Sequence, residues 1–187
     1  YHSSLVLTLI LALALSTSGV VDSTTLIPPP THTPGQSSTC TVGGVSFNMS
    51  YVPAAANFPT GTDDLGKGGV KMAFLMAKTE VTYQLWDAVY NWAIDAARGA
   101  NQYHFQNSGV MGDGLGRTNQ HPVTNIYWRD AIVWCNALTE YYNAQNGTSL
   151  GCVYKSEIDP IRNATDTVTC DAVVPDDTAK GFRLPTS

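Results

Sequence analysis

The stretch HPVTNIYWRDAIVWCNALTEYYN, residues 121–143, has the clearest secondary-structure pattern in this chain. From Trp128 onward its apolar side chains recur at three- and four-residue spacing, as in an amphipathic helix. Asp130 falls in the first turn, where the positive end of the helix dipole favours a carboxylate. We predict a helix over residues 128–143. The side chains predicted to face the core are Ala131, Trp134, Cys135, Leu138 and Tyr142.

A second amphipathic helix is predicted upstream, in TYQLWDAVYNWAIDAARG, residues 82–99. Thr82 is its predicted N-cap, because a Thr hydroxyl can accept a hydrogen bond from a free N–H of the first turn. Gly99 is predicted to close its C-terminal end. The face predicted to be buried comprises Leu85, Trp86, Val89, Trp92 and Ala93.

Two strands are predicted ahead of these helices from alternation with period two. In residues 42–53, Val45, Phe47, Met49 and Tyr51 fall on one face, after a two-glycine lead-in. In residues 70–80 the corresponding set is Val70, Met72, Phe74 and Met76, whose methionines are predicted to pack in the core. Two helices, sparse short strands and abundant glycine predict a loop-rich α+β fold.

The remaining segments are predicted to lie at the surface. Residues 98–128 form a glycine-rich loop around Asp113 that lacks the pattern of a phosphate-binding or calcium-binding loop. His104 and His121 stand in it without a metal-binding pattern, so structural roles are predicted for both. Residues 147–181 are polar with only short apolar runs, and we predict a long surface insertion there.

The first residues indicate export. The apolar run from Leu5 to Leu15 has the length of a secretory signal core and is too short for a stable membrane span. We predict a signal peptide over residues 1–22, a Pro/Ser/Thr-rich linker over 23–39 and a folded domain over 40–187. The protein is therefore expected in the periplasm, at the cell surface or secreted. Its net charge of −5 disfavours a nucleic-acid partner.

Three phrases, taken in order, resemble one family. FLMAKTEVTYQLWDAV (74–89), HPVTNIYWRDAIVWCNALTEYYN (121–143) and GFRLPTS (181–187) are similar to phrases of the formylglycine-generating enzymes, or sulfatase-modifying factor domains. The resemblance covers residues 43–187. It implies a C-type-lectin-like α+β fold, and the long detour before GFRLPTS resembles bacterial exported members. Ser187 stands where relatives usually have Glu.

For catalytic members, the resemblance implies oxidation of a sulfatase cysteine to formylglycine by molecular oxygen, with copper held by two cysteines. Those cysteines and the family's calcium-binding loops belong to the second half of the domain, beyond Ser187. No catalytic, cofactor-binding or metal-binding residue is therefore predicted within this chain. Because it begins on Tyr1 and stops on a Pro-Thr-Ser typical of a helix cap, we expect a truncated domain with Leu85, Trp86 and Val89 partly exposed.

The sequence also supports predictions about the cysteines and about the function. Cys135 lies mid-helix on the apolar face and is predicted to be structural. Cys152 and Cys170 are the most local pair in the predicted insertion, and in an exported protein we predict a disulfide between them. Two functions remain open: an oxidase acting on a sulfatase polypeptide, and a lectin-like module that binds a carbohydrate or protein partner. Iron-dependent sulfoxide synthases share the fold, but their H-x-x-x-H spacing is missing here.

Overall fold

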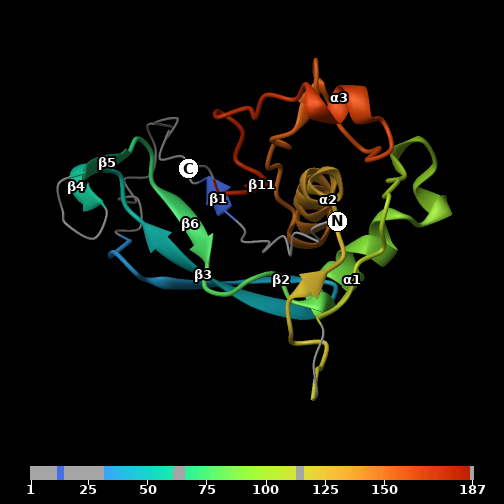
Figure 1. Cartoon of the computed structure of the whole chain (residues 1–187), viewed down its shortest axis with the longest axis horizontal. Coiled ribbons are helices and arrows are strands. Elements are labelled where there is room, and N and C mark those ends of the chain that lie inside the picture. The colour runs from blue at the N-terminus through green and yellow to red at the C-terminus, as the bar shows by residue number, and fades with distance from the viewer. Residues whose placement is uncertain (1–11, 15–31, 61–65, 113–115, 186–187) are drawn as a thin grey trace, which may run out of the picture.

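The computed structural model describes residues 12–14, 32–60, 66–112 and 116–185, with main chain only for 12–14, 57–60, 66 and 67. Its centre is a five-stranded sheet in the order β11-β1-β6-β3-β2, with every neighbouring pair antiparallel. Two helices, α1 and α2, pack on this sheet (Figure 1). The strands are β1 (Ala12–Ala14), β2 (Ser37–Val42), β3 (Val45–Val52), β6 (Phe74–Ala77) and β11 (Phe182–Arg183).

Helices and three small strand pairs complete the described fold. The helical segments are α1 (Tyr83–Ala93), the 3-10 helix η1 (Ala96–Asn101), α2 (Trp128–Asn146) and α3 (Thr167–Asp171). The paired strands are β4 (Ala55–Thr60) with β5 (Gly66–Val70), β7 (Val110–Met111) with β8 (Val123–Thr124), and β9 (Lys155–Ser156) with β10 (Asp159–Pro160). The predicted α+β class is confirmed. Asp113 lies outside the described residues.

The two glycines before β3 form a turn. Gly43 and Gly44 have φ angles of 57° and 74°, as the two central residues of a type I′ hairpin turn require. They connect β2 to β3, and the strand β2 was not predicted from the sequence. β2 begins at Ser37 and so includes the last three residues of the stretch predicted as linker.

β1 comes from the apolar run predicted to be a signal peptide. Its main chain pairs with β6, Ala12 opposite Met76, and with β11, Ala12 opposite Arg183. Removing residues 1–22 would leave the facing edges of β6 and β11 without this neighbour. The signal peptide stays a prediction. Among the residues that the structure describes, no helix has the length and apolar character needed to cross a membrane.

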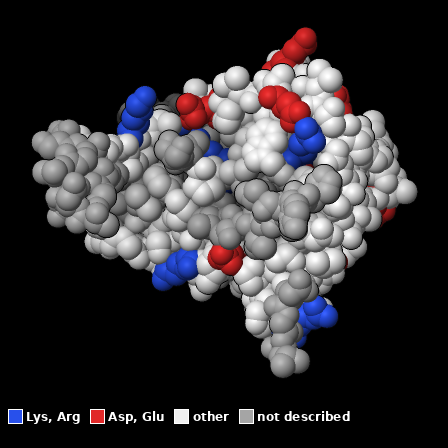
Figure 2. All heavy atoms as spheres, viewed as in Figure 1, with Lys and Arg blue, Asp and Glu red and all other residues white. Residues whose placement is uncertain are grey.

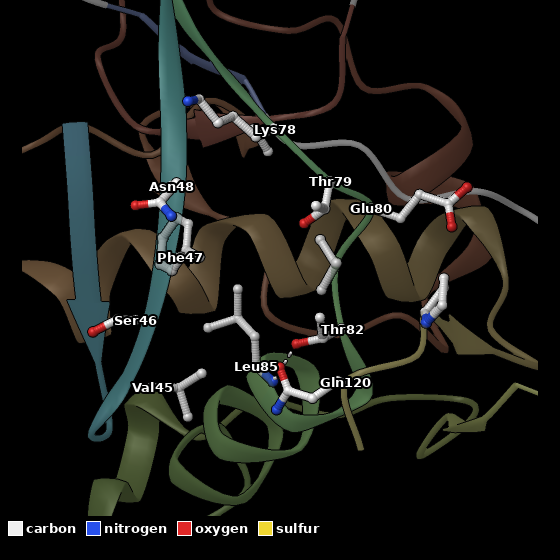
Figure 3. A pocket seen from close by; sticks show the side chains of 13 residues that line it. Val45, Ser46, Phe47, Asn48, Lys78, Thr79, Glu80, Thr82, Leu85 and Gln120 are labelled. Carbon is white, nitrogen blue, oxygen red and sulfur yellow. Dashed lines mark hydrogen bonds between the residues drawn. The ribbon is translucent and has the colours of Figure 1, made fainter. Parts of the chain in front are cut away.

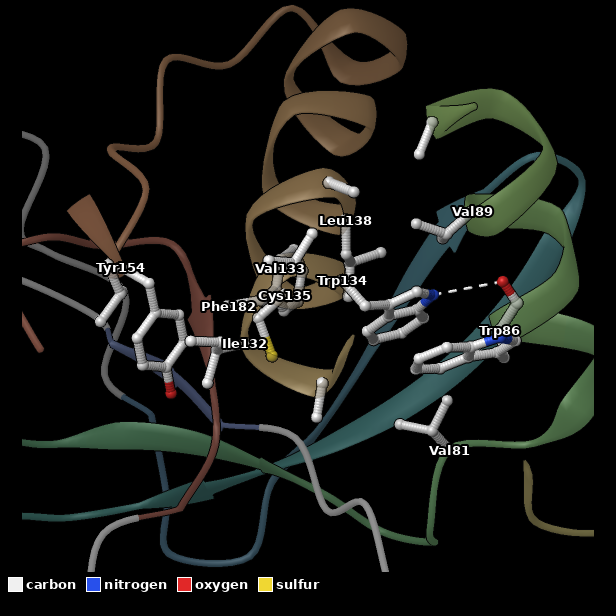
Figure 4. Packing of buried hydrophobic residues seen from close by; sticks show 14 of the residues in the cluster. Val81, Trp86, Val89, Ile132, Val133, Trp134, Cys135, Leu138, Tyr154 and Phe182 are labelled. Carbon is white, nitrogen blue, oxygen red and sulfur yellow. Dashed lines mark hydrogen bonds between the residues drawn. The ribbon is translucent and has the colours of Figure 1, made fainter. Parts of the chain in front are cut away.

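The core lies where α1 and α2 meet above the sheet. The indoles of Trp86 and Trp134 stack with centroids 5.2 Å apart and an interplanar angle of 6°, and Trp134 Nε1 donates to the Trp86 carbonyl at 3.2 Å (Figure 4). Leu85, Trp86 and Val89 are all buried, so the expectation of a partly exposed α1 face is wrong. α2 and the sheet cover that face within this chain.

Both helices begin as predicted, and α1 ends earlier than predicted. Thr82 caps α1 by accepting from Leu85 N at 3.2 Å. α1 stops at Ala93, because Asp95 caps the following 3-10 helix through Ala97 N and Gln102 Nε2 donates to the Ile94 carbonyl. In α2 the predicted inward side chains are buried, except that Tyr142 is only half-buried.

The alternation predicted for residues 70–80 has the wrong phase. Met72 is 45% exposed, and the buried side chain of β6 is Leu75. The chain bends at Lys71 and Met72, between β5 and β6, and a bend breaks the period of two. In β3 the alternation holds, with Met49 buried and Ser46 and Asn48 exposed.

Residues 147–181 are not the surface insertion that their polarity predicts. This segment curves around α2 (Figure 1), and its buried residues are Cys152, Val153, Tyr154, Ile161, Ala164, Cys170 and Ala179. Asn136 of α2 holds it in place: its Nδ2 donates to the carbonyls of Tyr154 (2.6 Å) and Ile161 (3.1 Å), and its Oδ1 accepts from Tyr154 N. The buried Asn136 amide therefore supplies hydrogen-bond partners to main-chain groups that the polar composition had predicted to be exposed to water.

The segment ends at the phrase GFRLP, whose glycine is required by a close approach. A Cβ on Gly181 would lie 2.5 Å from the Gly151 carbonyl oxygen and 2.8 Å from the Thr139 side chain. This closeness lets Gly181 N donate to Gly151 O, and Phe182 N donate to Thr139 Oγ1, each at 2.9 Å. The phrase thus joins β11 to α2.

The predicted Cys152–Cys170 disulfide is wrong: both cysteines are free thiols. The Cys152 thiol points to the Asn136 carbonyl of α2, and the Cys170 thiol points to the Asn163 carbonyl beside α3. Closeness in sequence was a poor guide because the chain between them forms the β9–β10 hairpin and then α3.

We expect the stability of this segment to depend on pH through Asp176. Its carboxylate accepts from Lys155 Nζ at 2.7 Å and from the N–H and hydroxyl of Thr178, and these bonds hold the pKa of Asp176 well below its usual range. A lowered folded-state pKa stabilises the fold above about pH 4, and this contribution is lost as the pH falls further. As the pH falls from about 4 to 2, Asp176→Asn should therefore lose less of its free energy of unfolding than the wild type does. Urea unfolding at a series of pH values measures this.

The matched control is Asp177→Asn, because the Asp177 side chain is 80% exposed and lies 3.7 Å from its cation, Arg183. It should keep the wild-type pH dependence. Equal pH slopes for wild type and Asp176→Asn would contradict the prediction.

Candidate functional site

A pocket opens between β3 and the connection that leads from β6 to α1 (Figure 3). Its volume is about 460 Å³, within the usual range for small-ligand sites. Its lining comes from β3 (Val45, Ser46, Phe47, Asn48), from the chain between β6 and α1 (Ala77, Lys78, Thr79, Glu80, Val81, Thr82), and from Leu85, Gln120 and Pro122. Sequence reasoning did not predict it.

The pocket exists because β3 and β6 separate like a fork. The two strands pair from Val52 opposite Phe74 to Met49 opposite Ala77, and a last hydrogen bond joins Lys78 N to Asn48 O at 3.0 Å. Beyond it the chain turns to the β7–β8 pair. There Val81 O accepts from Val123 N, and Thr82 bridges to Pro122. Among the described residues, β2 is the one strand that still pairs with β3 along this stretch.

The floor of the pocket is apolar. Leu85, at the start of α1, and Val81 each have 3% exposed surface and belong to the main core. Phe47 is half-buried, and its ring centroid lies 6.0 Å from that of Phe182. An apolar base formed by the core itself gives this part of the pocket a fixed shape.

The rim of the pocket is polar, and some of its side chains form no hydrogen bond or ion pair with other described residues. Within the described part of the chain, neither the Lys78 ammonium nor the Glu80 carboxylate has a hydrogen-bond or ion-pair partner. Three other polar side chains are already engaged: Thr82 Oγ1 caps α1, Gln120 Nε2 donates to Gln84 Oε1, and the Ser46 hydroxyl bonds Thr41 Oγ1 at 2.9 Å. Two side chains of opposite charge, Lys78 and Glu80, therefore lie at the rim of the pocket, and the Glu80 carboxylate points away from the apolar floor (Figure 3).

None of the four cysteines lines this pocket, and burial raises the pKa of every thiol. For Cys152 burial and then the nearby Glu140 charge raise the pKa to about 12. Cys135 is fully buried on α2, as its predicted structural role requires. A thiol with a raised pKa holds very little of the nucleophilic thiolate at neutral pH.

We accordingly expect the cysteines to resist alkylation. In the folded protein, iodoacetamide at pH 7.5 should label Cys40, Cys135, Cys152 and Cys170 at least about 100-fold more slowly than in urea, because thiolate and access are both lacking. Peptide mass spectrometry after timed quenching measures this, with the urea-unfolded chain as control. Native labelling of any of the four at its unfolded rate would contradict the burial shown here.

Away from the pocket, a polar cluster at α2 serves the fold. Glu140 pairs with Arg98 at 2.8 Å and with Arg162, and the Arg98 guanidinium lies 3.6 Å from the Trp92 ring centroid. Tyr103 is fully buried beside it, and its pKa is raised by burial and then by the Glu140 charge. These contacts tie η1 and residues 102–104 to α2.

The two predicted structural histidines lie apart. His121 Nδ1 accepts from Thr118 N at 2.9 Å and so closes the turn before β8, while His104 pairs through its main chain with Arg162 and Ala164. In the described ranges, no three His, Cys, Asp or Glu side chains gather as they would around a metal ion.

These features define a loop-rich α+β domain in which two helices pack on an antiparallel sheet and a long segment covers the second helix. The family model for the sulfatase-modifying factor enzyme 1-like domain matches residues 36–187. The chain belongs to this family, as the three sequence phrases predicted.

One solved structure is similar to the chain. It is the variable protein 1 of Treponema denticola, with 29% sequence identity and a TM-score of 0.54. The match covers 80% of this chain and 53% of that protein, so this chain spans about half its length. A comparison with curated proteins gives no match.

Proposed function

We propose that this chain is a recognition module whose ligand binds in the pocket between β3 and the β6–α1 connection. The observation that carries the proposal is the pairing of a rigid apolar floor, Leu85 and Phe47, with the unpartnered charges of Lys78 and Glu80. Sites for small ligands typically combine such a floor with a few polar groups that orient the ligand. The net charge of −5 makes a nucleic acid an unsuitable partner.

The test is a binding screen with a variant that fills the pocket. Wild-type protein is screened on glycan and peptide arrays beside Thr79→Trp, since Thr79 lines the pocket and is exposed. The control is Ser156→Trp, on the exposed face of β9. A ligand of this pocket should lose at least about tenfold in affinity with Thr79→Trp and nothing with the control. Equal binding by all three proteins would refute the proposal.

The family match favours a second candidate, the oxidation of a sulfatase cysteine to formylglycine by molecular oxygen. If the protein is such an oxidase, the thiols of this chain act as core residues and the reacting groups belong to another part of the protein. A copper-dependent oxygen-consumption assay with a sulfatase-motif peptide, run on the natural full-length protein, tests this candidate. Residues 1–187 alone are expected to be inactive, and turnover by them would place the chemistry here.

Export is part of the same proposal. The apolar run before the Pro/Ser/Thr-rich stretch supports a cleaved signal, which would present the domain on a tether outside the cytoplasm. N-terminal sequencing of the protein recovered from its native host checks this: a start near Ser23 supports export. A start upstream of the apolar run would refute cleavage.

A further inference from the structure

We propose that the pocket binds an extended peptide, which adds to β3 as a short strand beside Ser46. This inference rests on the proposed function, because it takes the pocket as the recognition site and names its ligand class. The ligand would be recognised mainly through its main chain, with side chains adding selectivity.

The main-chain groups of Ser46 face the pocket. In an antiparallel sheet, the N–H and C=O of one residue point to the same neighbouring strand, and those of successive residues point to opposite sides. The bond from Lys78 N to Asn48 O shows that Asn48 faces the β6 side. The main-chain groups of Ser46, two residues earlier, point to the same side, but at this position β6 no longer pairs with β3.

The opposite edge of β3 is already used. Val45 pairs with Val42 across the two-residue turn, and Phe47 pairs with Cys40. These residues direct their main-chain groups to β2. Of the two edges of β3, the pocket-facing one between Val45 and Asn48 has no paired strand among the described residues and can therefore receive one.

The dimensions suit a short strand. From Val45 to Asn48 the strand advances by three residue steps of about 3.3 Å each, which is the length of about three peptide residues. The walls are formed by β3 on one side and residues 79–82 on the other, with the apolar floor between them (Figure 3). A paired strand would place alternate side chains on that floor and outward.

The chemistry of the rim favours a peptide over a sugar. A sugar is bound mainly through side-chain donors and acceptors, and three of those that line the pocket, the hydroxyls of Ser46 and Thr82 and the amide of Gln120, are already bonded within the protein. A peptide needs main-chain partners, which Ser46 supplies. The unpaired ammonium of Lys78, where the fork begins, would select an acidic side chain on the peptide.

The experiment uses defined probes on the whole chain. Three acetylated, amidated pentapeptides of sequence TVXVT, with X as Asp, Asn or Lys, are titrated into ¹⁵N-labelled protein, beside N-methylated versions and the sugar maltotriose. We expect the Asp peptide to bind best, to shift the Ser46 and Lys78 amide signals, and to lose at least about tenfold in affinity when the central amide is N-methylated.

Matched variants locate the contact. Ser46→Pro deletes the pocket-facing N–H, keeps the main-chain bonds to β2 and removes the hydroxyl bond to Thr41 Oγ1, and it should lower peptide affinity at least about tenfold. Ser37→Pro is the control, because Ser37 opens β2 and, by the same alternation, faces away from β3. Ser46→Ala keeps the main chain and should bind as wild type does.

The outcomes separate this inference from the proposed function. Binding of maltotriose at these residues without any peptide binding would overturn the peptide ligand and keep a recognition pocket. Failure of all three peptides, or equal affinity for the N-methylated forms, would also overturn it. A Ser46 shift that grows with protein concentration alone would assign the edge to a second copy of the chain. The N-methylated peptides keep the test valid if Ser46→Pro fails to fold.

Discussion

Replacing Trp134 by alanine is expected to lower the free energy of unfolding by about 3–5 kcal/mol. Trp134 is fully buried in α2, stacks on Trp86 of α1 and donates to the Trp86 carbonyl. The substitution would leave a cavity at the centre of the core and remove the stacked pair that joins the two helices (Figure 4). Chemical denaturation monitored by circular dichroism measures the change.

Trp128 supplies the control on the same helix. It occupies the first position of α2 and is 41% exposed, so Trp128→Ala should cost less than about 1 kcal/mol. Trp134→Phe should recover part of the loss, because a smaller ring can still fill part of the site. A Trp134→Ala protein as stable as Trp128→Ala would show that the α1–α2 contact does not carry the fold.

A second large loss is expected from Asp130→Ala. Asp130 is fully buried, and its carboxylate accepts hydrogen bonds from the main-chain N–H groups of Tyr127, Gln106 and Asn107, and from the Asn107 side chain. Alanine would leave these donors unpaired, at about 1–3 kcal/mol for each one that water cannot reach. We expect a loss of about 3–5 kcal/mol in the free energy of unfolding.

This prediction can be separated from a general loss of negative charge near α2. Asp171 forms a bidentate ion pair with Arg129, but the Asp171 side chain is 53% exposed. Asp171→Ala should therefore change the free energy of unfolding far less than Asp130→Ala does. Hydrogen exchange of the Gln106 and Asn107 amides gives a local measure, since both should lose protection in Asp130→Ala only. Similar losses for the two variants would mean that Asp130 acts through its charge alone.

The repeating patterns predicted helices and one strand well, because a period reports which face is buried. The spacing around Trp134 and Trp86 located α1 and α2, and Thr82 was correctly predicted as an N-cap. β3 followed from its alternation. Family membership followed from three ordered phrases, and the match over residues 36–187 confirmed it.

Predictions failed where a distant partner decides the local structure. Residues 147–181 appeared polar, yet Asn136 supplies buried partners for their main chain. The phase of the alternation near Met72 depends on a bend between two strands that belong to different sheets. The pairing of Cys152 with Cys170 was inferred from closeness in sequence, whereas the fold directs the two thiols to separate carbonyls.

The sequence by itself determined the α+β class, the two main helices with their buried faces and the family. Each depends on spacing within one segment or on a short phrase, and such information is local. The tertiary structure alone decided the candidate site. Its floor comes from β3 and α1, its free edge from the point where β6 stops pairing with β3, and its charges from Lys78 and Glu80, which have no partner among the described residues. No single segment encodes these features, because a pocket is the space that several packed segments leave between them.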